Sequence, residues 1–213
     1  MSILVTMAIA LGVYLATEAV EYICHWLFCR RIEVDPSWLE DVPLTDEDNE
    51  LIQKNRDLLQ SLLKNNDIAS TMSSLSIEER VDLLVKIIQG AINNYNVNID
   101  SIRFSPSSEI GEFILGYYDV EQNRIMINLD YLASDTPDAL RRIVRTIFHE
   151  LRHAQQYRAI TDENYNYGTE DQRKHWSLNF VNYISPDVDF QDYSDQAIER
   201  DARAVAENSC YGF

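Results

Sequence analysis

Two histidines four positions apart, with a glutamate directly after the first, are the residues of this chain best suited to metal chemistry. His149, Glu150 and His153 form the pattern His-Glu-x-x-His. On a helix, residues four apart lie on one face, so both imidazoles could bind one ion. Glu150 lies about 100° round the helix from His149, where it can reach a zinc-activated water without binding the metal. The pattern predicts a zinc site that hydrolyses peptide bonds, with Glu150 as general base.

A catalytic zinc ion usually has a third protein ligand and keeps its fourth position for water. Ala159 stands ten residues after His149, so the third histidine of the long metzincin pattern is missing. His175 is one candidate, but it lies in a polar, irregular stretch. Glu199 is favoured, because alanines three and seven positions later would let its helix approach the motif closely. The alternative for Glu199 is an exposed ion pair with Arg203, one helical turn on.

A long helix should carry the motif. Thr136 can serve as its N-cap and Pro137 as its first residue, and it should run to about Arg158. Apolar side chains at helical spacing would bury this helix beside the histidines: Leu140, Ile143, Val144, Ile147, Phe148 and Leu151. We expect Asp201, half a turn from Glu199, to support the ligands indirectly or to pair with a nearby arginine.

Shorter elements should surround the motif helix. A capping box of Ser76 and Glu79 predicts a helix from Ile77 to about Tyr95. Ser194 can cap a last helix. The other expected elements are helices over Asp46–Asn65, Arg173–Tyr183 and Asp195–Glu207, and strands over Ile102–Phe104, Phe113–Asp119 and Arg124–Asn128.

Residues 1–31 differ in composition from the rest of the chain. Ile3 to Ala16 is almost purely apolar, and Arg30 and Arg31 close the segment. Two interpretations stay open: a helical membrane anchor that holds the remaining chain at the cytoplasmic face, or a soluble helix packed on the domain or a partner. Residues 32–75 are expected to form an acidic linker and a helix. Residues 76–213 are expected to form the metallopeptidase domain.

The overall composition excludes some classes of partner. The formal net charge of -17 makes nucleic acid a poor candidate, since phosphate binding needs a surface rich in lysine and arginine. Three cysteines, an odd number without zinc-ribbon or redox spacing, favour a reducing compartment. We therefore expect a cytoplasmic protein, with or without the tether.

The motif and the region around Glu199 together resemble the small gluzincin metallopeptidases. The stretches His-Glu-Leu-Arg-His-Ala-Gln-Gln and Ile-Glu-Arg-Asp-Ala-Arg-Ala-Val-Ala look like those of the ImmA/IrrE-like and phage-type minigluzincin peptidases. The resemblance implies zinc bound by His149, His153 and Glu199. It also implies an α+β, zincin-like fold with a small, mainly antiparallel sheet, an active-site helix and a glutamate helix, preceded by N-terminal helices. Arg124–Asn128 would be the edge strand that binds extended substrate.

We therefore expect a zinc-dependent endopeptidase that acts on protein or peptide substrates. The alternative is a zinc-stabilised interaction module, with or without a membrane tether, that binds but does not cut. The sequence leaves open which residue would stabilise the transition state, and the candidates are Tyr157, Tyr165, Tyr167, Tyr193 and His175. Substrate preference and oligomeric state have no signature in it.

Overall fold

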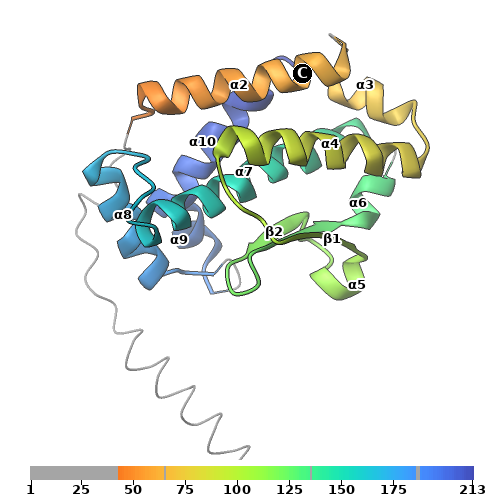
Figure 1. Ribbon diagram of the computed structural model, residues 1–213. Helices are drawn as coiled ribbons and strands as arrows, with labels where there is room; N and C mark the ends of the chain where they lie inside the picture. The colour runs from red at the N-terminus through yellow and green to blue at the C-terminus, as the bar shows by residue number, and fades with distance from the viewer. Residues whose placement is uncertain (1–42, 65, 135, 186–187) are drawn as a thin grey trace, which may run out of the picture. The chain divides into compact units, whose positions relative to one another are not determined.

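The computed structural model describes residues 43–213 apart from 65, 135, 186 and 187. The predictions for residues 1–31 and for most of the linker lie outside these residues. Among the described residues, no helix is both long and apolar enough to cross a membrane. The elements, labelled in Figure 1, are α2 (Asp46–Leu63), α3 (Ile68–Ser73), α4 (Ile77–Tyr95), β1 (Ser101–Ser105), α5 (Ser107–Ile110), β2 (Gly116–Asp119), β3 (Arg124–Asn128), α6 (Leu129–Ala133), α7 (Pro137–Thr161), α8 (Glu170–Val181), α9 (Phe190–Asp195) and α10 (Ala197–Cys210). The fold is thus α+β, as predicted.

Two capping boxes begin the helices α4 and α2. In α4, Ser76 and Glu79 exchange both hydrogen bonds, with the Glu79 N–H to Ser76 Oγ at 3.3 Å, and the prediction for this helix is confirmed at both ends. Thr45 and Asp48 form the same motif at the start of α2, where the sequence had suggested only a helix. Each box gives partners to two N–H groups at the start of the helix, which have none within the helix.

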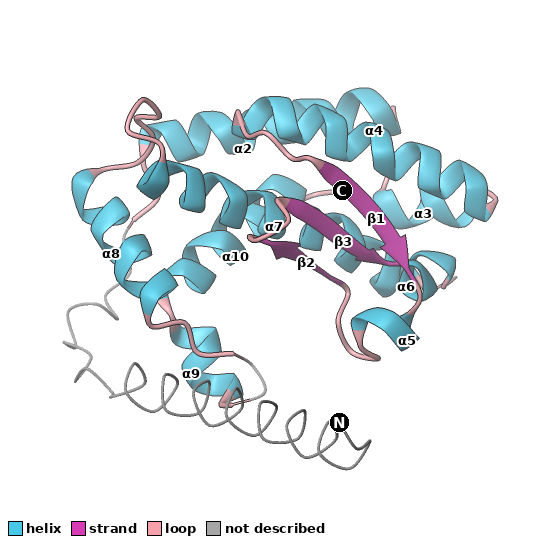
Figure 2. Ribbon diagram, turned by 60° about the horizontal axis from the view of Figure 1, so that its bottom comes forward, coloured by secondary structure: helices cyan, strands magenta, loops and turns pink. Residues whose placement is uncertain are grey.

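The sheet is mixed rather than mainly antiparallel, which corrects the prediction. Its order is β1-β3-β2, with β3 antiparallel to β2 and parallel to β1 (Figure 2). A tight turn joins β2 to β3, and β1 pairs along the other side of β3. The chain returns through α5 and a loop between β1 and β2, which makes β1 and β3 run in the same direction. The strand Arg124–Asn128 is consequently central, and β2 is the edge strand that faces the motif helix.

The helix α7 is the centre of the fold. It packs against β2, α3, α4, α6, α8 and α10, and its predicted apolar side chains are fully buried. Gly116 lets β2 lie close to both β3 and α7, because a Cβ there would meet the Met126 carbonyl oxygen of β3 at 2.6 Å and Thr146 of α7 at 3.3 Å. Thr136 occupies the N-cap position as predicted, but its hydroxyl contacts Ser134 Oγ at 3.0 Å instead of capping the first turn.

The last predicted helix begins later than expected. Ser194 lies inside the short helix α9, and Gln196 takes the N-cap position of α10 with an extended backbone. The Gln196 side chain forms hydrogen bonds of 2.9 Å with both the N–H and the carbonyl of Ile184. These bonds hold the junction between the two helices against the preceding loop, so a single helix from Asp195 does not form.

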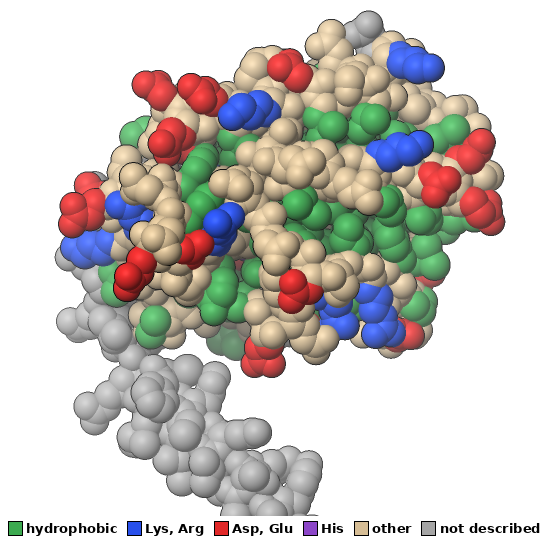
Figure 3. All heavy atoms as spheres, viewed as in Figure 1, with side chains coloured by type: hydrophobic (Ala, Val, Ile, Leu, Met, Phe, Trp, Pro, Cys, Tyr) green, Lys and Arg blue, Asp and Glu red, His purple; other side chains and the backbone are tan. Residues whose placement is uncertain are grey.

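Acidic and basic side chains are interspersed on the face of the molecule shown in Figure 3, with apolar side chains between them. The described part of this face shows no single basic patch of the kind that nucleic-acid binding would need.

Candidate metal centre

Three potential ligands from two helices meet at one point. The Nε2 atoms of His149 and His153, both on α7, lie 2.9 Å apart. Glu199 on α10 places Oε2 at 3.1 Å from His149 Nε2 and Oε1 at 3.3 Å from His153 Nε2. One ligand atom from each residue lies within 4.8 Å of the others. The three residues selected from the sequence are therefore brought together.

Small side chains bring the two helices close enough for this meeting. Ala202 and Ala206, on the same face of α10 as Glu199, are almost fully buried against the core. Glu199 itself has no exposed surface, so the alternative of an exposed ion pair with Arg203 is wrong. Arg203 donates instead to the carbonyl of Ser194.

The protein charges at this point favour binding of a cation or protons. Burial opposes ionisation of Glu199, but the neighbouring His153 and His149 outweigh it and hold the pKa of this carboxyl well below its usual range. Burial likewise opposes protonation of His153, yet the Glu199 carboxylate raises the pKa of that ring to about 9. A buried carboxylate and two imidazole nitrogens facing one another form a donor set that suits zinc.

Glu150 lies beside the three candidate ligands and is held by the edge strand. The N–H of Tyr118 in β2 donates to Glu150 Oε2 at 2.9 Å. Burial raises the pKa of Glu150, although the nearby histidines and this hydrogen bond act in the opposite direction. A carboxylate whose pKa is raised accepts a proton more readily near neutral pH, which suits a general base.

An open cleft of about 910 Å³ leads to these four residues. One wall comes from β2 and the loop before it, and another from the segment between α8 and α10. The rim includes several exposed apolar side chains, namely Phe113, Ile114, Tyr117, Tyr183 and Phe190. The cleft is large enough to hold several residues of a peptide.

Tyr183 is a site residue that the sequence reasoning missed. Its hydroxyl donates to Glu199 Oε1 at 3.0 Å, and its ring meets Tyr193 edge-on. Tyr157 and Tyr193, two of the predicted candidates, also line the cleft, whereas Tyr165, Tyr167 and His175 do not. Tyr183 follows α8 in an irregular stretch, and no spacing rule singles it out.

Asp201 pairs with an arginine, as one of its two predicted roles required. Arg152 Nε donates to Asp201 Oδ2 at 2.7 Å, and Arg152 Nη2 to Oδ1 at 2.9 Å. Both residues lie close to a candidate ligand in the sequence, since Arg152 directly precedes His153 and Asp201 comes two positions after Glu199. The pair therefore joins α7 to α10 directly beside the candidate metal centre.

Comparisons of this chain with protein-family models, with curated proteins and with solved structures found no match. The function proposed below is therefore based on the geometry of the site and on the sequence motifs.

Proposed function

We propose that this protein is a zinc-dependent endopeptidase with a zincin-like fold. The observation that carries the proposal is the meeting of His149, His153 and Glu199 at one point, with Glu150 beside them at the base of an open cleft. Among the described residues, this group contains three ligands and no fourth histidine, cysteine or carboxylate. Three protein ligands in an open cleft are typical of catalytic zinc, and four in a closed site are typical of structural zinc.

The donor set fits the ion. Two imidazole nitrogens and one carboxylate oxygen match the ligands of known zinc hydrolase sites. Zinc bound there would supply a Lewis acid that lowers the pKa of water and polarises a peptide carbonyl. The rest of the chemistry falls to residues of this chain.

Glu150 would take a proton from the attacking water and deliver it to the leaving amine. The Tyr118 N–H holds one of its carboxylate oxygens, and Glu150 lines the cleft. Tyr183 would stabilise the oxygen that gains charge once its hydroxyl turns from Glu199 Oε1, to which it donates at 3.0 Å, toward the substrate. Partial burial and the charge of Glu199 raise the pKa of Tyr183, so its phenol keeps the hydrogen that such a contact needs.

The substrate proposed is a protein or peptide in an extended conformation. The edge strand β2 lines the cleft, and strand edges bind extended peptides through backbone hydrogen bonds. The apolar rim would receive side chains of the bound segment. This role belongs to β2 and not to Arg124–Asn128, which is paired on both sides.

The variant Glu150→Gln tests the mechanism. It keeps the shape of the side chain but removes the base, so zinc should stay bound while cleavage of a denatured protein such as casein falls by at least about 100-fold. Zinc content would be measured by atomic absorption and cleavage by release of labelled peptides. Glu163→Gln, at an exposed position outside the cleft, is the matched control. Unchanged cleavage by Glu150→Gln would refute the mechanism, and a wild type that binds zinc without cleaving would favour the interaction module.

A further inference from the structure

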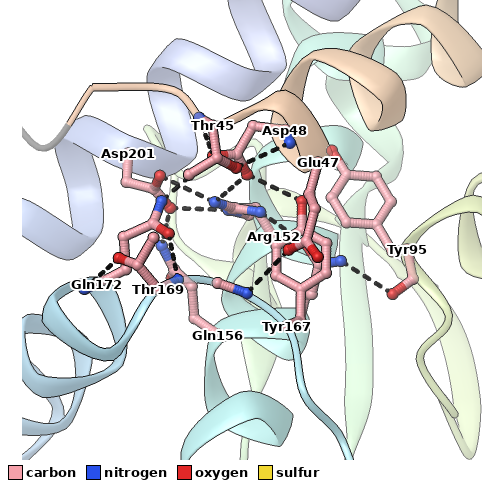
Figure 4. Close-up of polar contacts among 12 residues, drawn as sticks. Thr45, Glu47, Asp48, Tyr95, Arg152, Gln156, Tyr167, Thr169, Gln172 and Asp201 are labelled. Carbon is pink, nitrogen blue, oxygen red and sulfur yellow. Dashed lines mark hydrogen bonds and ion pairs between the residues drawn. The ribbon is translucent and has the colours of Figure 1, made fainter.

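Arg152 occupies the middle of the motif and is fully buried, although it is not a ligand. Besides Asp201 it contacts Asp48 Oδ1 at 2.8 Å (Figure 4). It also donates to Gln155 Oε1 at 2.8 Å. The rings of Tyr167 and Trp176 both lie 5.1 Å from its guanidinium carbon. Its two carboxylate partners come from α2 and α10, so the side chain ties three helices together.

Gln156 connects this buried pair to a candidate ligand. Its Nε2 donates to Asp201 Oδ2 at 2.6 Å and to the Ile198 carbonyl at 3.1 Å. Its Oε1 lies 2.9 Å from His153 Nδ1. The Gln156 side chain has no exposed surface, so water does not replace these partners.

The two acceptors fix the orientation of the Gln156 amide. If the amide were flipped, its oxygen would face a carboxylate oxygen and a carbonyl oxygen, and two buried acceptors would lose their donor. The oxygen must therefore face His153 Nδ1, which then has to carry a hydrogen. With Nδ1 protonated, the lone pair of a neutral His153 ring is on Nε2, the atom that faces His149 and Glu199.

We propose that Arg152 and Asp201 act through Gln156 as positioning residues, which hold His153 in the tautomer and ring orientation that bind a metal ion at Nε2. The inference rests on the metal site of the proposed function, but it does not require that the site cleaves peptides. Arg152 fixes the Asp201 carboxylate by two hydrogen bonds, Asp201 orients the Gln156 amide, and the amide orients the His153 ring. Removing a group that orients a metal-bound histidine typically weakens metal binding by about 10- to 100-fold.

Two neighbouring glutamines provide a matched pair of variants. Gln155 and Gln156 are both buried on α7 and both form side-chain hydrogen bonds around Arg152 and Asp201. Of the two, Gln156 contacts the candidate ligand His153. In the full-length protein, Gln155→Leu and Gln156→Leu should lower the urea midpoint by similar amounts. Affinity for Zn²⁺, measured by competition with a chromophoric chelator, should fall about 10- to 100-fold in Gln156→Leu and less than about 3-fold in Gln155→Leu.

Two aspartates on opposite sides of Arg152 provide the second pair. Asp201→Asn places an amide hydrogen against Arg152 or Gln156 in either orientation, so it should weaken Zn²⁺ binding in the same range. Asp48→Asn disturbs Arg152 but leaves the Asp201–Gln156–His153 contacts in place, so it should leave the affinity nearly unchanged.

The outcomes separate this inference from the proposed function. Equal Zn²⁺ affinities for Gln156→Leu and Gln155→Leu, or for Asp201→Asn and Asp48→Asn, would overturn the positioning role even if the wild type cleaves. A wild type that binds Zn²⁺ without cleaving would refute the proposed peptidase function. The Zn²⁺ affinities of the paired variants would then still test the positioning role. A wild type that does not bind Zn²⁺ would overturn both.

Discussion

The helix α7 carries two polar clusters that differ in how their charges are balanced. In one, Arg152 is surrounded by Asp48, Asp201, the Gln155 amide and two aromatic rings, and its hydrogen-bonding groups have partners. In the other, two imidazoles and Glu199 direct their nitrogen and oxygen atoms at one another and open on a cleft. The first cluster is complete within the protein, whereas the second is suited to a cation from outside.

This difference separates a contribution to folding from a contribution to function. Buried ion pairs with full hydrogen bonding hold elements in register, and breaking one partner leaves a buried charge alone. Groups whose acceptor atoms face one another need a proton or another cation between them, and such clusters are found where binding is their purpose. Mutations in the first cluster should therefore lower the free energy of unfolding, whereas a metal ion should raise it through the second cluster.

Replacement of Arg152 should give the largest change in stability. Arg152→Met keeps the length of the side chain but leaves Asp48 and Asp201 without their cation, so the free energy of unfolding should fall by about 3–5 kcal/mol. Urea unfolding followed by circular dichroism, in the presence of EDTA, measures this loss without any contribution from metal.

Arg158→Met is the control for that loss. Arg158 lies on the same helix, pairs with Asp162 and stacks on the Tyr165 ring, but its side chain is 35% exposed. Its removal should cost at most about 1 kcal/mol. Similar losses for the two arginines would mean that the Arg152 cluster is not the special contact described above.

Zinc should stabilise the protein through the other cluster. At a free Zn²⁺ concentration 100 times the dissociation constant, the free energy of unfolding should rise by about 2.7 kcal/mol. In Glu199→Gln, which removes the ligand charge, the same concentration should add less than about 0.5 kcal/mol if affinity falls 100-fold or more. Thermal unfolding with buffered zinc measures both, and an equal rise in the variant would place the ion elsewhere.

Local patterns predicted much of this molecule. The capping box at Ser76 and the apolar spacing gave α4 correctly, because both depend on residues within one helix. The motif spacing predicted that His149 and His153 would face the same point, because a four-residue helical interval fixes their relative position. The alanines near Glu199 indicated that its helix could approach them.

The contacts that depend on distant segments were beyond such patterns. Arg152 reads as one of the two variable positions of the motif, and its partners Asp48 and Asp201 lie 104 positions before and 49 positions after it in the sequence. The sheet order depended on the path from β1 to β2, and Tyr183 reaches Glu199 only through the fold of an irregular stretch. Tertiary packing decides these cases, not local propensity.

The smallest effect should be a pH dependence of the Arg152 cluster. Burial acts to raise the pKa of Asp48, but Arg152 and the hydrogen bonds from Thr45 and Tyr167 outweigh it and lower the pKa. A carboxyl whose pKa is lower in the folded state stabilises the fold above its unfolded pKa of about 3.9, and this contribution is lost as the pH falls toward the folded value. Asp48→Asn should therefore lower the free energy of unfolding by about 1–2 kcal/mol at pH 6.5 and by less at pH 3.

Urea unfolding at both pH values measures the difference, with Asp57→Asn on the exposed face of α2 as the control for loss of one negative charge. A cost that stays constant or grows at pH 3 would show that Asp48 holds α2 through its neutral hydrogen bonds and not through its charge.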